Sequence, residues 1–233
     1  MYLGWLLARN NALEVLKALN VPIVFYWPLK LLESKNKHLG LGERMANAAI
    51  SAGPTFVKFG QALSTRTDLL GPEITAEIAH LRDRLPAFSS EKAKKTIEKE
   101  LGSNIKDLFS SFEDVPIAAA SIAQVHFAIT SAGEEVAVKV LRPNIEKAFS
   151  RDLELLRWLA RLAVRLRPAW KRLRLADGVE VFAEMVRMEM DLRLEGAAAS
   201  ELRENFENDP SYHVPKVFWQ YAGKRVLTTS RVP

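Results

Sequence analysis

The 233-residue sequence contains no cysteine, which excludes disulfides and cysteine-ligated zinc sites and fits a reducing compartment. It also lacks long uninterrupted apolar runs. Residues 1–32 are rich in Leu, Trp, Phe and Tyr, but charged residues at positions 9, 14, 17 and 30 interrupt them. No run there reaches the roughly 20 residues that span a bilayer, and the pattern of a signal peptide is absent. We therefore expect neither a transmembrane helix nor a cleaved leader.

The aromatic residues near the amino end allow two interpretations. Trp5, Phe25, Tyr26 and Trp27 could form an anchor that lies in a membrane interface. The simpler alternative is that they pack against the rest of the domain.

Composition sets only broad limits. With 48% hydrophobic residues the chain can bury a core, and its length fits one large domain or two small ones. The net charge of +5 favours anionic partners such as nucleotide, lipid headgroups or nucleic acid, and does not choose among them.

One lysine stands out in the apolar segment 135–140. Lys139 lies among valines, and a buried ammonium needs an anionic partner because an unpaired buried charge is very costly. In protein kinases such a lysine follows a loop of pattern G-x-G-x-x-G-x-V that covers phosphates. The three glycine positions and the valine of that pattern correspond here to Ala118, Ala120, Ala123 and Val125.

The alanines change what this loop can do. A β-carbon restricts positive φ and close approach to phosphates, so we expect nucleotide to be held differently from an ordinary kinase. The alternative is a plain hairpin in which Lys139 reaches solvent.

Two further segments carry polar residues at suggestive spacing. In a predicted helix over 53–66, Lys58 and Gln61 share a face, although an ordinary solvated helix would look the same. A second predicted helix, capped by Asp177 and running to about residue 205, carries Glu189, Asp191 and Glu195.

The spacing of these acids restricts how they can point. Residues four apart share a helix face and residues two apart do not, so Asp191 and Glu195 are expected to face together. Glu189 is then expected to reach toward the amino-terminal extension that carries Lys58, or to mark a local distortion. An exposed acidic face is the alternative interpretation.

Residues 144–173 predict a basic helix broken at Pro168, with Arg157, Arg161 and Arg165 forming a stripe and Trp158 nearby. Contact with an anionic membrane and a merely solvated face are both compatible with it. Nucleic acid is disfavoured, because no recognition module is present. The remaining pattern predicts helices near 42–51, 72–81, 89–101 and 105–109, and strands near 112, before and after the turn 131–133, and over 215–221 and 226–229.

The sequence Lys58-Phe59-Gly60-Gln61, the alanine-rich loop, the Lys139 strand and Glu189-Met190-Asp191 occur in the order found in one family. Together they resemble the UbiB family of atypical protein-kinase-like ATPases, which is tied to ubiquinone biosynthesis. The resemblance runs from about residue 53 to the end.

The resemblance implies a role for each motif. Lys139 would contact the phosphates and Glu195 would hold Lys139, while Glu189 and Asp191 form the Glu-x-Asp motif. Lys58 and Gln61 would occupy the place where a peptide docks in ordinary kinases, which argues against generic protein phosphorylation. The loop that would cover the phosphates consists of Ile117, Ala118, Ala119, Ala120, Ser121, Ile122, Ala123, Gln124 and Val125.

The resemblance also implies an α+β fold: a kinase-like amino lobe with a five-stranded antiparallel sheet and an αC-type helix, and no carboxy-terminal lobe. We expect a helical extension over 1–110 and the lobe over 111–233, with inserted helices at about 144–175. The implied ligands are ATP or ADP, and Mg²⁺ in the complete protein. The implied partners are a membrane or ubiquinone-pathway lipid and other proteins of that pathway, at the cytoplasmic side of a membrane.

The sequence holds neither D-F-G nor H-R-D, the motifs that supply metal ligands and the catalytic base in kinases. We therefore expect a fragment or truncated form that is inactive alone, with no metal ligand of its own. The competing hypothesis is a non-catalytic module that binds a lipid or a partner through the helical extension and the basic helix.

Overall fold

The computed structural model describes residues 2–18, 23, 26–33, 39–79 and 86–232. Contacts divide the chain into two compact units, residues 1–83 with 147–183 and residues 84–146 with 184–233. The chain therefore passes between the units three times. The division predicted from the sequence, at residue 110, follows motifs rather than contacts and stays a prediction.

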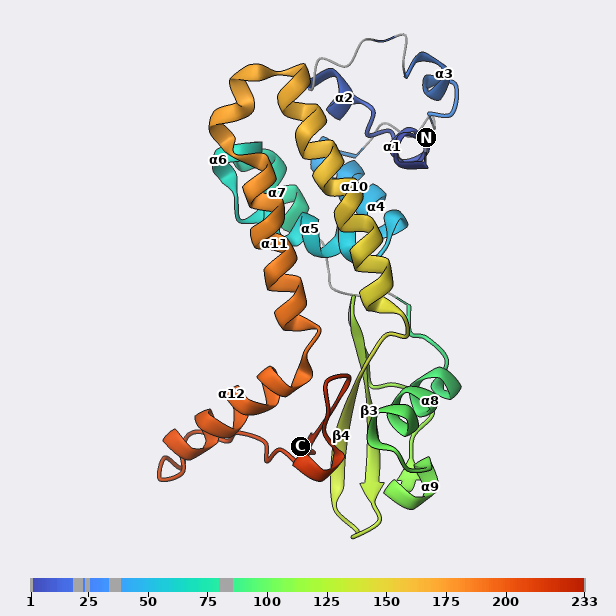
Figure 1. The fold of residues 1–233 in the computed structure, drawn as a ribbon, viewed down its shortest axis with the longest axis vertical. Helices are drawn as coiled ribbons and strands as arrows, with labels where there is room; N and C mark the ends of the chain where they lie inside the picture. Colours follow the sequence, from blue (N-terminus) through green and yellow to red (C-terminus); the bar gives the residue numbers. More distant parts are fainter. Residues whose placement is uncertain (1, 19–22, 24–25, 34–38, 80–85, 233) are drawn as a thin grey trace. The chain divides into compact units, whose positions relative to one another are not determined.

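The first unit is helical in its described part (Figure 1). The helices α4 (Leu41–Ala52), α5 (Pro54–Ser64) and α7 (Pro72–Ala79) contact one another. Gly53 separates α4 from α5 with a φ of 115°, a backbone conformation that favours glycine, and Pro54 begins α5. The other helical segments of this unit are α1 (Tyr2–Arg9), α2 (Glu14–Ala18), α3 (Trp27–Lys30), α6 (Thr67–Leu70), the 3-10 turn η2 (Pro168–Leu173) and most of α10 (Ile145–Leu166) and α11 (Leu175–Glu189).

Side-chain contacts join the amino-terminal helices of this unit to α10 and α11. The Thr55 hydroxyl on α5 donates to Asp152 Oδ2 on α10 at 2.7 Å, and both residues are buried. On the same helix α5, Phe59 meets Phe182 of α11 edge to face, with ring centroids 5.3 Å apart. These contacts place one face of α5 against α10 and α11.

The predicted basic stripe on α10 is only partly a solvated surface. Arg161 and Arg165 are exposed, but the Arg157 guanidinium donates to Glu180 of α11 at 2.7 and 2.9 Å and to Glu154 at 2.7 Å. Arg157 therefore links the two helices. Membrane contact of this face stays a prediction.

The aromatic residues near the amino end differ in their environment. Tyr26 is buried, whereas Trp5 and Trp27 are 38% and 60% exposed, and Phe25 lies outside the described residues. Among the three described aromatic residues, packing therefore accounts for Tyr26, and the membrane anchor stays a prediction. Within the described chain, no helix combines the length and the apolar character needed to cross a bilayer.

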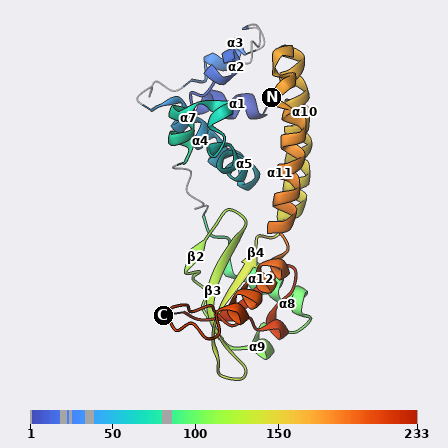
Figure 2. The same ribbon diagram turned by 90° about the vertical axis from the view of Figure 1, so that its left-hand side faces the viewer.

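The second unit contains a five-stranded antiparallel sheet, as the sequence predicted (Figure 2). The strands β1 (Phe109–Phe112), β3 (Ala123–Thr130), β4 (Glu135–Leu141) and β5 (Val226–Ser230) lie in the order β1-β3-β4-β5, and the short β2 (Ala118–Ala119) pairs with β3. The predicted turn between β3 and β4 is present, and Gly133 takes a φ of 89° there.

One face of this sheet is the core of the unit. Side chains alternate along β4, so that Val136, Val138 and Val140 point to this face and are fully buried. The helix α8 (Ser90–Leu101) packs on the same face and places Ile97 against these valines, and the short α9 (Ile105–Leu108) leads into β1. The opposite face of β4, which carries Lys139, is only half buried.

Two sequence predictions about this unit are wrong. The strand expected at 215–221 is a single bridge between Val217 and Thr229 followed by the 3-10 turn η3 (Trp219–Tyr221), because the chain turns away after that one pairing. The long helix expected from Asp177 to about residue 205 is two helices, α11 and α12 (Leu192–Asn205). Asp177 lies in the first turn of α11 and its carboxylate binds Arg174.

The buried residue His126 of β3 is held by hydrogen bonds at both of its ring nitrogens. His126 Nδ1 lies 2.7 Å from the carbonyl oxygen of Glu113, which can only accept, so Nδ1 carries the proton. Nε2 then accepts from Gln124 Nε2 at 2.8 Å, and the Gln124 amide also pairs with the backbone of Phe88. The geometry thus requires neutral imidazole, and burial lowers the pKa of His126 below its ordinary value.

We expect this histidine to make folding weaker in mild acid. Because the folded-state pKa of His126 is lowered, the unfolded chain binds the proton first as the pH falls below about 6.5. The free energy of unfolding should fall by about 1.4 kcal/mol for each pH unit between the unfolded and folded pKa values. Thermal unfolding from pH 8 to 5.5 measures this slope. His126→Asn should flatten it and His213→Asn should not, whereas equal slopes in all three proteins would contradict the assignment.

Candidate functional site

The candidate site lies on the half-buried face of β4 and begins with an ion pair. Lys139 Nζ donates to both carboxylate oxygens of Glu195 on α12, at 2.8 and 2.7 Å. The contact expected from the resemblance is therefore present. The sequence led us to expect a buried Lys139, and this is only partly so. The side chains of Lys139 and Glu195 are 31% and 51% exposed.

An apolar patch adjoins this ion pair on the same face. Val125 of β3 pairs directly with Lys139, and Ala137 precedes Lys139 by two residues, so all three side chains point to one side. Val125 and Ala137 are half buried. A cation beside a small apolar surface suits a ligand with a charged end and a flat apolar end, such as a nucleotide.

Helix α12 comes close to the sheet at Gly196, directly after Glu195. A β-carbon there would lie 3.0 Å from Leu227 Cδ1 of β5 and 3.1 Å from Trp219 Cη2. The absent side chain lets α12 approach β5, and this approach brings Glu195 within reach of Lys139.

The alanine-rich segment forms a tight turn between β2 and β3. The Ile117 amide donates to the Val125 carbonyl at 2.9 Å, and the Ala120 amide donates to the Ala123 carbonyl at 2.8 Å. Ala118 and Ala119 pair with Val125 and Gln124 in the sheet. The segment is thus a hydrogen-bonded hairpin that ends next to Val125.

The nine residues predicted to cover phosphates therefore have different environments. Ile117 is 50% exposed, whereas Ser121, Ile122, Ala123 and Gln124 are buried. The Gln124 side chain binds Phe88 and His126 on the other side of β3. That the backbone of this turn covers phosphates stays a prediction.

The Glu-x-Asp motif lies where α11 ends and α12 begins. Glu189 is the last residue of α11, and Asp191 is the N-cap of α12, accepting from the Arg193 amide at 3.2 Å. The Arg193 guanidinium also donates to both Asp191 oxygens at 2.8 and 2.6 Å, and it lowers the pKa of that carboxyl.

Asp191 is the N-cap of α12 and lies before its first residue, so the helix-face argument does not apply to it, and the shared orientation of Asp191 and Glu195 stays a prediction. The alternative of a local distortion near Glu189 is confirmed, since the chain leaves the helix at Met190 and Asp191. On a continuous helix Glu189 and Asp191, two residues apart, would lie on different faces, and the break removes that restriction.

Lys58 and Gln61 lie on α5 in the first unit and are half buried. Glu189, Asp191, Lys139 and Glu195 belong to the second unit. The meeting of the two motifs stays a prediction.

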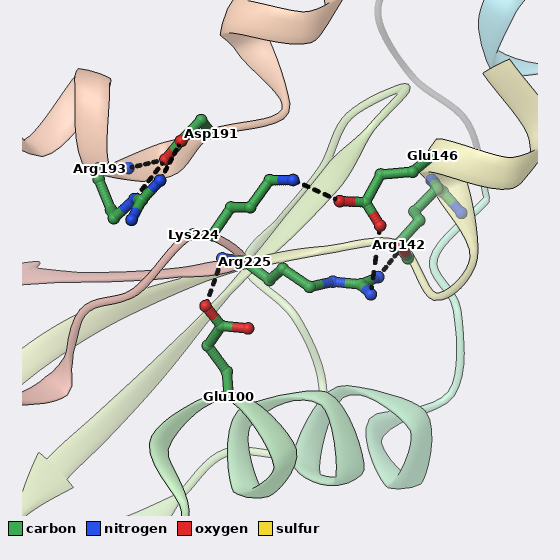
Figure 3. Close-up of polar contacts among 7 residues, drawn as sticks. All are labelled: Glu100, Arg142, Glu146, Asp191, Arg193, Lys224 and Arg225. Carbon is green, nitrogen blue, oxygen red and sulfur yellow. Dashed lines mark hydrogen bonds and ion pairs between the residues drawn. The ribbon is translucent and has the colours of Figure 1, made fainter. Parts of the chain in front are cut away.

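Sequence reasoning missed a charged junction beside this site (Figure 3). Its members are Glu100, Arg142, Glu146, Asp191, Arg193, Lys224 and Arg225. They form two groups of contacts: Arg225 binds Glu100, Glu146 and the Arg142 carbonyl, with Lys224 also on Glu146, and Asp191 separately binds Arg193. No spacing of residues along the sequence predicts these contacts, because most of them join residues that only the fold brings together.

Metal binding finds no support among these residues. Within the described part of the chain, no three His, Asp or Glu side chains come together to hold a metal ion.

Comparison with known proteins identifies the family. Residues 80–233 match the model of the ABC1 atypical kinase-like domain. The chain is 41% identical over 222 residues to the probable protein kinase UbiB of Pseudomonas paraeruginosa, covering 92% of this chain and 42% of that protein. It is 44% identical over 194 residues to the probable protein kinase UbiB of Marinobacter nauticus, covering 83% of this chain and 36% of that protein.

A solved structure agrees with these sequence relatives. The complex structure of Rv3197-erythromycin from Mycobacterium tuberculosis is similar with a TM-score of 0.51 and 31% identity, covering 75% of this chain and 44% of that one. The chain thus spans less than half the length of the relatives it matches. Its motifs, its kinase-like sheet and these matches agree, and the chain belongs to the family of ABC1 atypical kinase-like domains.

Proposed function

We propose that this chain is the nucleotide-binding part of a UbiB-type atypical kinase or ATPase that supports ubiquinone biosynthesis. The observation that carries the proposal is the Lys139–Glu195 ion pair beside the apolar patch of Val125 and Ala137. In kinases this lysine contacts the α- and β-phosphates and the glutamate orients it. The ligand is ATP or ADP, of which ATP would supply the phosphoryl group in the complete protein.

Each part of the site has a proposed task. Lys139 binds phosphate oxygens, Glu195 holds Lys139 in place, and Val125 and Ala137 contact the adenine. The turn from Ile117 to Val125 lies over the phosphates. From the family resemblance, Lys58 and Gln61 have the proposed task of excluding a generic peptide acceptor, and Glu189 and Asp191 form the Glu-x-Asp motif.

The ubiquinone role and a membrane lipid partner rest on the UbiB relatives and on surface chemistry. Near α3 the side chains of Trp27, Leu31 and Leu32 are 60%, 78% and 50% exposed. An exposed aromatic and aliphatic group of this kind suits the interface of a membrane. The net charge of +5 of the whole chain favours an anionic lipid as the partner.

Titration of this chain with ADP and with ATP, each with and without Mg²⁺, tests the proposal by thermal unfolding. Ligand at 100 times its Kd should stabilise the folded protein by about 2.7 kcal/mol. Guanosine diphosphate at the same concentration is the control for binding by charge alone. An unchanged melting curve at millimolar ADP and ATP would reject the nucleotide site.

A further inference from the structure

We propose that Arg142 is a positioning residue that holds the alanine-rich turn, and that Arg225 joins Arg142 to the start of α12. The proposal rests on the nucleotide site proposed above and deepens it. The three parts of that site are the alanine-rich turn, the strand that carries Lys139 and the helix that carries Glu195. Two arginines that belong to none of the sequence motifs connect them through hydrogen bonds.

The first step is that Arg142 forms hydrogen bonds with the alanine-rich turn. Arg142 follows Lys139 by three residues, just past the end of β4. Its Nε and Nη2 donate to the Ala120 carbonyl at 3.3 and 2.9 Å, and its amide donates to the Ile122 carbonyl at 2.8 Å. Side chain and backbone of one residue thus hold both ends of the three-residue tip.

The second step is what anchors the guanidinium. Arg142 Nη2 also donates to the Pro86 carbonyl at 2.8 Å, and the guanidinium carbon lies 5.5 Å from the centre of the Phe88 ring. The Phe88 backbone is itself held by Gln124 of β3. The arginine fork therefore spans the turn and the segment that leads into α8. A lysine ammonium lacks the planar guanidinium that fixes these donors and stacks on Phe88, so it would hold the two carbonyls less rigidly.

The third step connects Arg142 to the turn before β5. The Arg142 carbonyl accepts from Arg225 Nη2 at 3.1 Å, and the Leu141 amide donates to the Arg225 carbonyl at 3.0 Å. Glu146 binds Lys224 at 3.0 Å and Arg225 at 3.5 Å, while the Arg225 amide donates to Glu100 of α8 at 3.2 Å (Figure 3).

The last step reaches the helix that carries Glu195. The Leu192 amide, in the first turn of α12, donates to the Lys224 carbonyl at 2.9 Å. Asp191, the N-cap of the same helix, binds Arg193 through both carboxylate oxygens (Figure 3). The alanine turn, the end of the Lys139 strand and the start of α12 are thus connected through consecutive hydrogen bonds.

This arrangement predicts which ligand contacts depend on Arg142. The turn would lie over the phosphates, whereas Val125 and Ala137 of the strands would contact the base. Loosening the turn should therefore weaken the binding of ADP and leave the binding of adenosine unchanged. A residue that acted only on overall stability would weaken both ligands alike.

The test combines ADP and adenosine titrations with hydrogen exchange of the peptide covering residues 117–124. In Arg142→Ala we expect faster exchange of this peptide and about tenfold weaker ADP binding, with adenosine binding unchanged. Arg142→Lys should fall between Arg142→Ala and the unchanged protein. Arg187→Ala, which removes an exposed arginine of the same unit, is the matched control and should change neither readout.

Each other outcome has a definite meaning. Unchanged exchange in Arg142→Ala would overturn the proposal, as would faster exchange with unchanged ADP affinity or an equal loss for ADP and adenosine. If the unchanged protein binds no ADP, the proposed function fails instead, and the exchange measurement still decides whether Arg142 holds the turn.

Discussion

Replacing Lys139 by alanine should weaken ADP binding by about 10- to 100-fold, the value of one charge-assisted contact of about 1.5–3 kcal/mol. Glu195 would keep its carboxylate in place without a cation, so the site would turn from neutral to repulsive for phosphate. Isothermal titration with ADP measures the change. Lys95→Ala, which removes an exposed lysine of α8, should leave the affinity within a factor of about two.

The variant should remain folded, which makes the result interpretable. The Lys139 and Glu195 side chains are 31% and 51% exposed, and ion pairs with that access to water contribute at most about 1 kcal/mol to folding. Glu195→Gln, which leaves the lysine without its charged partner, should lower ADP affinity by less than Lys139→Ala does. Full ADP affinity in Lys139→Ala would remove this residue from the site.

Replacing Thr55 by valine should destabilise the helical unit by about 1.5–3 kcal/mol. Valine has the shape of threonine but cannot donate to Asp152 Oδ2, which lies 2.7 Å from the hydroxyl. Asp152 is 5% exposed, so water cannot replace the lost donor. Its other oxygen binds Arg151, whose side chain is 78% exposed. Chemical denaturation followed by far-ultraviolet circular dichroism measures the loss.

A second substitution separates the lost hydrogen bond from lost packing. Asp152→Leu removes the buried carboxylate, so Thr55→Val should cost much less in that background. Thr65→Val is the matched control, because the Thr65 hydroxyl is exposed and binds the Ala62 carbonyl on its own helix. Additive effects of Thr55→Val and Asp152→Leu would contradict the assignment.

The sequence predicted the parts of the molecule that depend on neighbours along the chain. The alternation around Lys139 and the Gly133 turn identified β3, β4 and their hairpin, because strand faces and turn chemistry are local properties. The motif order also identified Glu195 as the partner of Lys139.

Other parts depended on contacts that no local pattern contains. The run Val217-Phe218-Trp219 has strand composition, yet one bridge to Thr229 is all that the sheet provides for it. No proline or glycine marks the break between α11 and α12, and an aspartate alone is a weak start signal. The partners of Arg142 and Arg225 lie up to 125 residues away, so only the fold brings them together.

The separation of β4 and β5 along the chain also affects how the protein is made. Their pairing encloses residues 142–225, so a ribosome completes β4 long before its neighbour exists. At about 5–20 residues per second the delay is on the order of 4 to 17 s. During that time the valine-rich strand presents an open edge to other nascent chains. Slow or stalled synthesis within residues 142–225 should therefore favour aggregation and recruit chaperones.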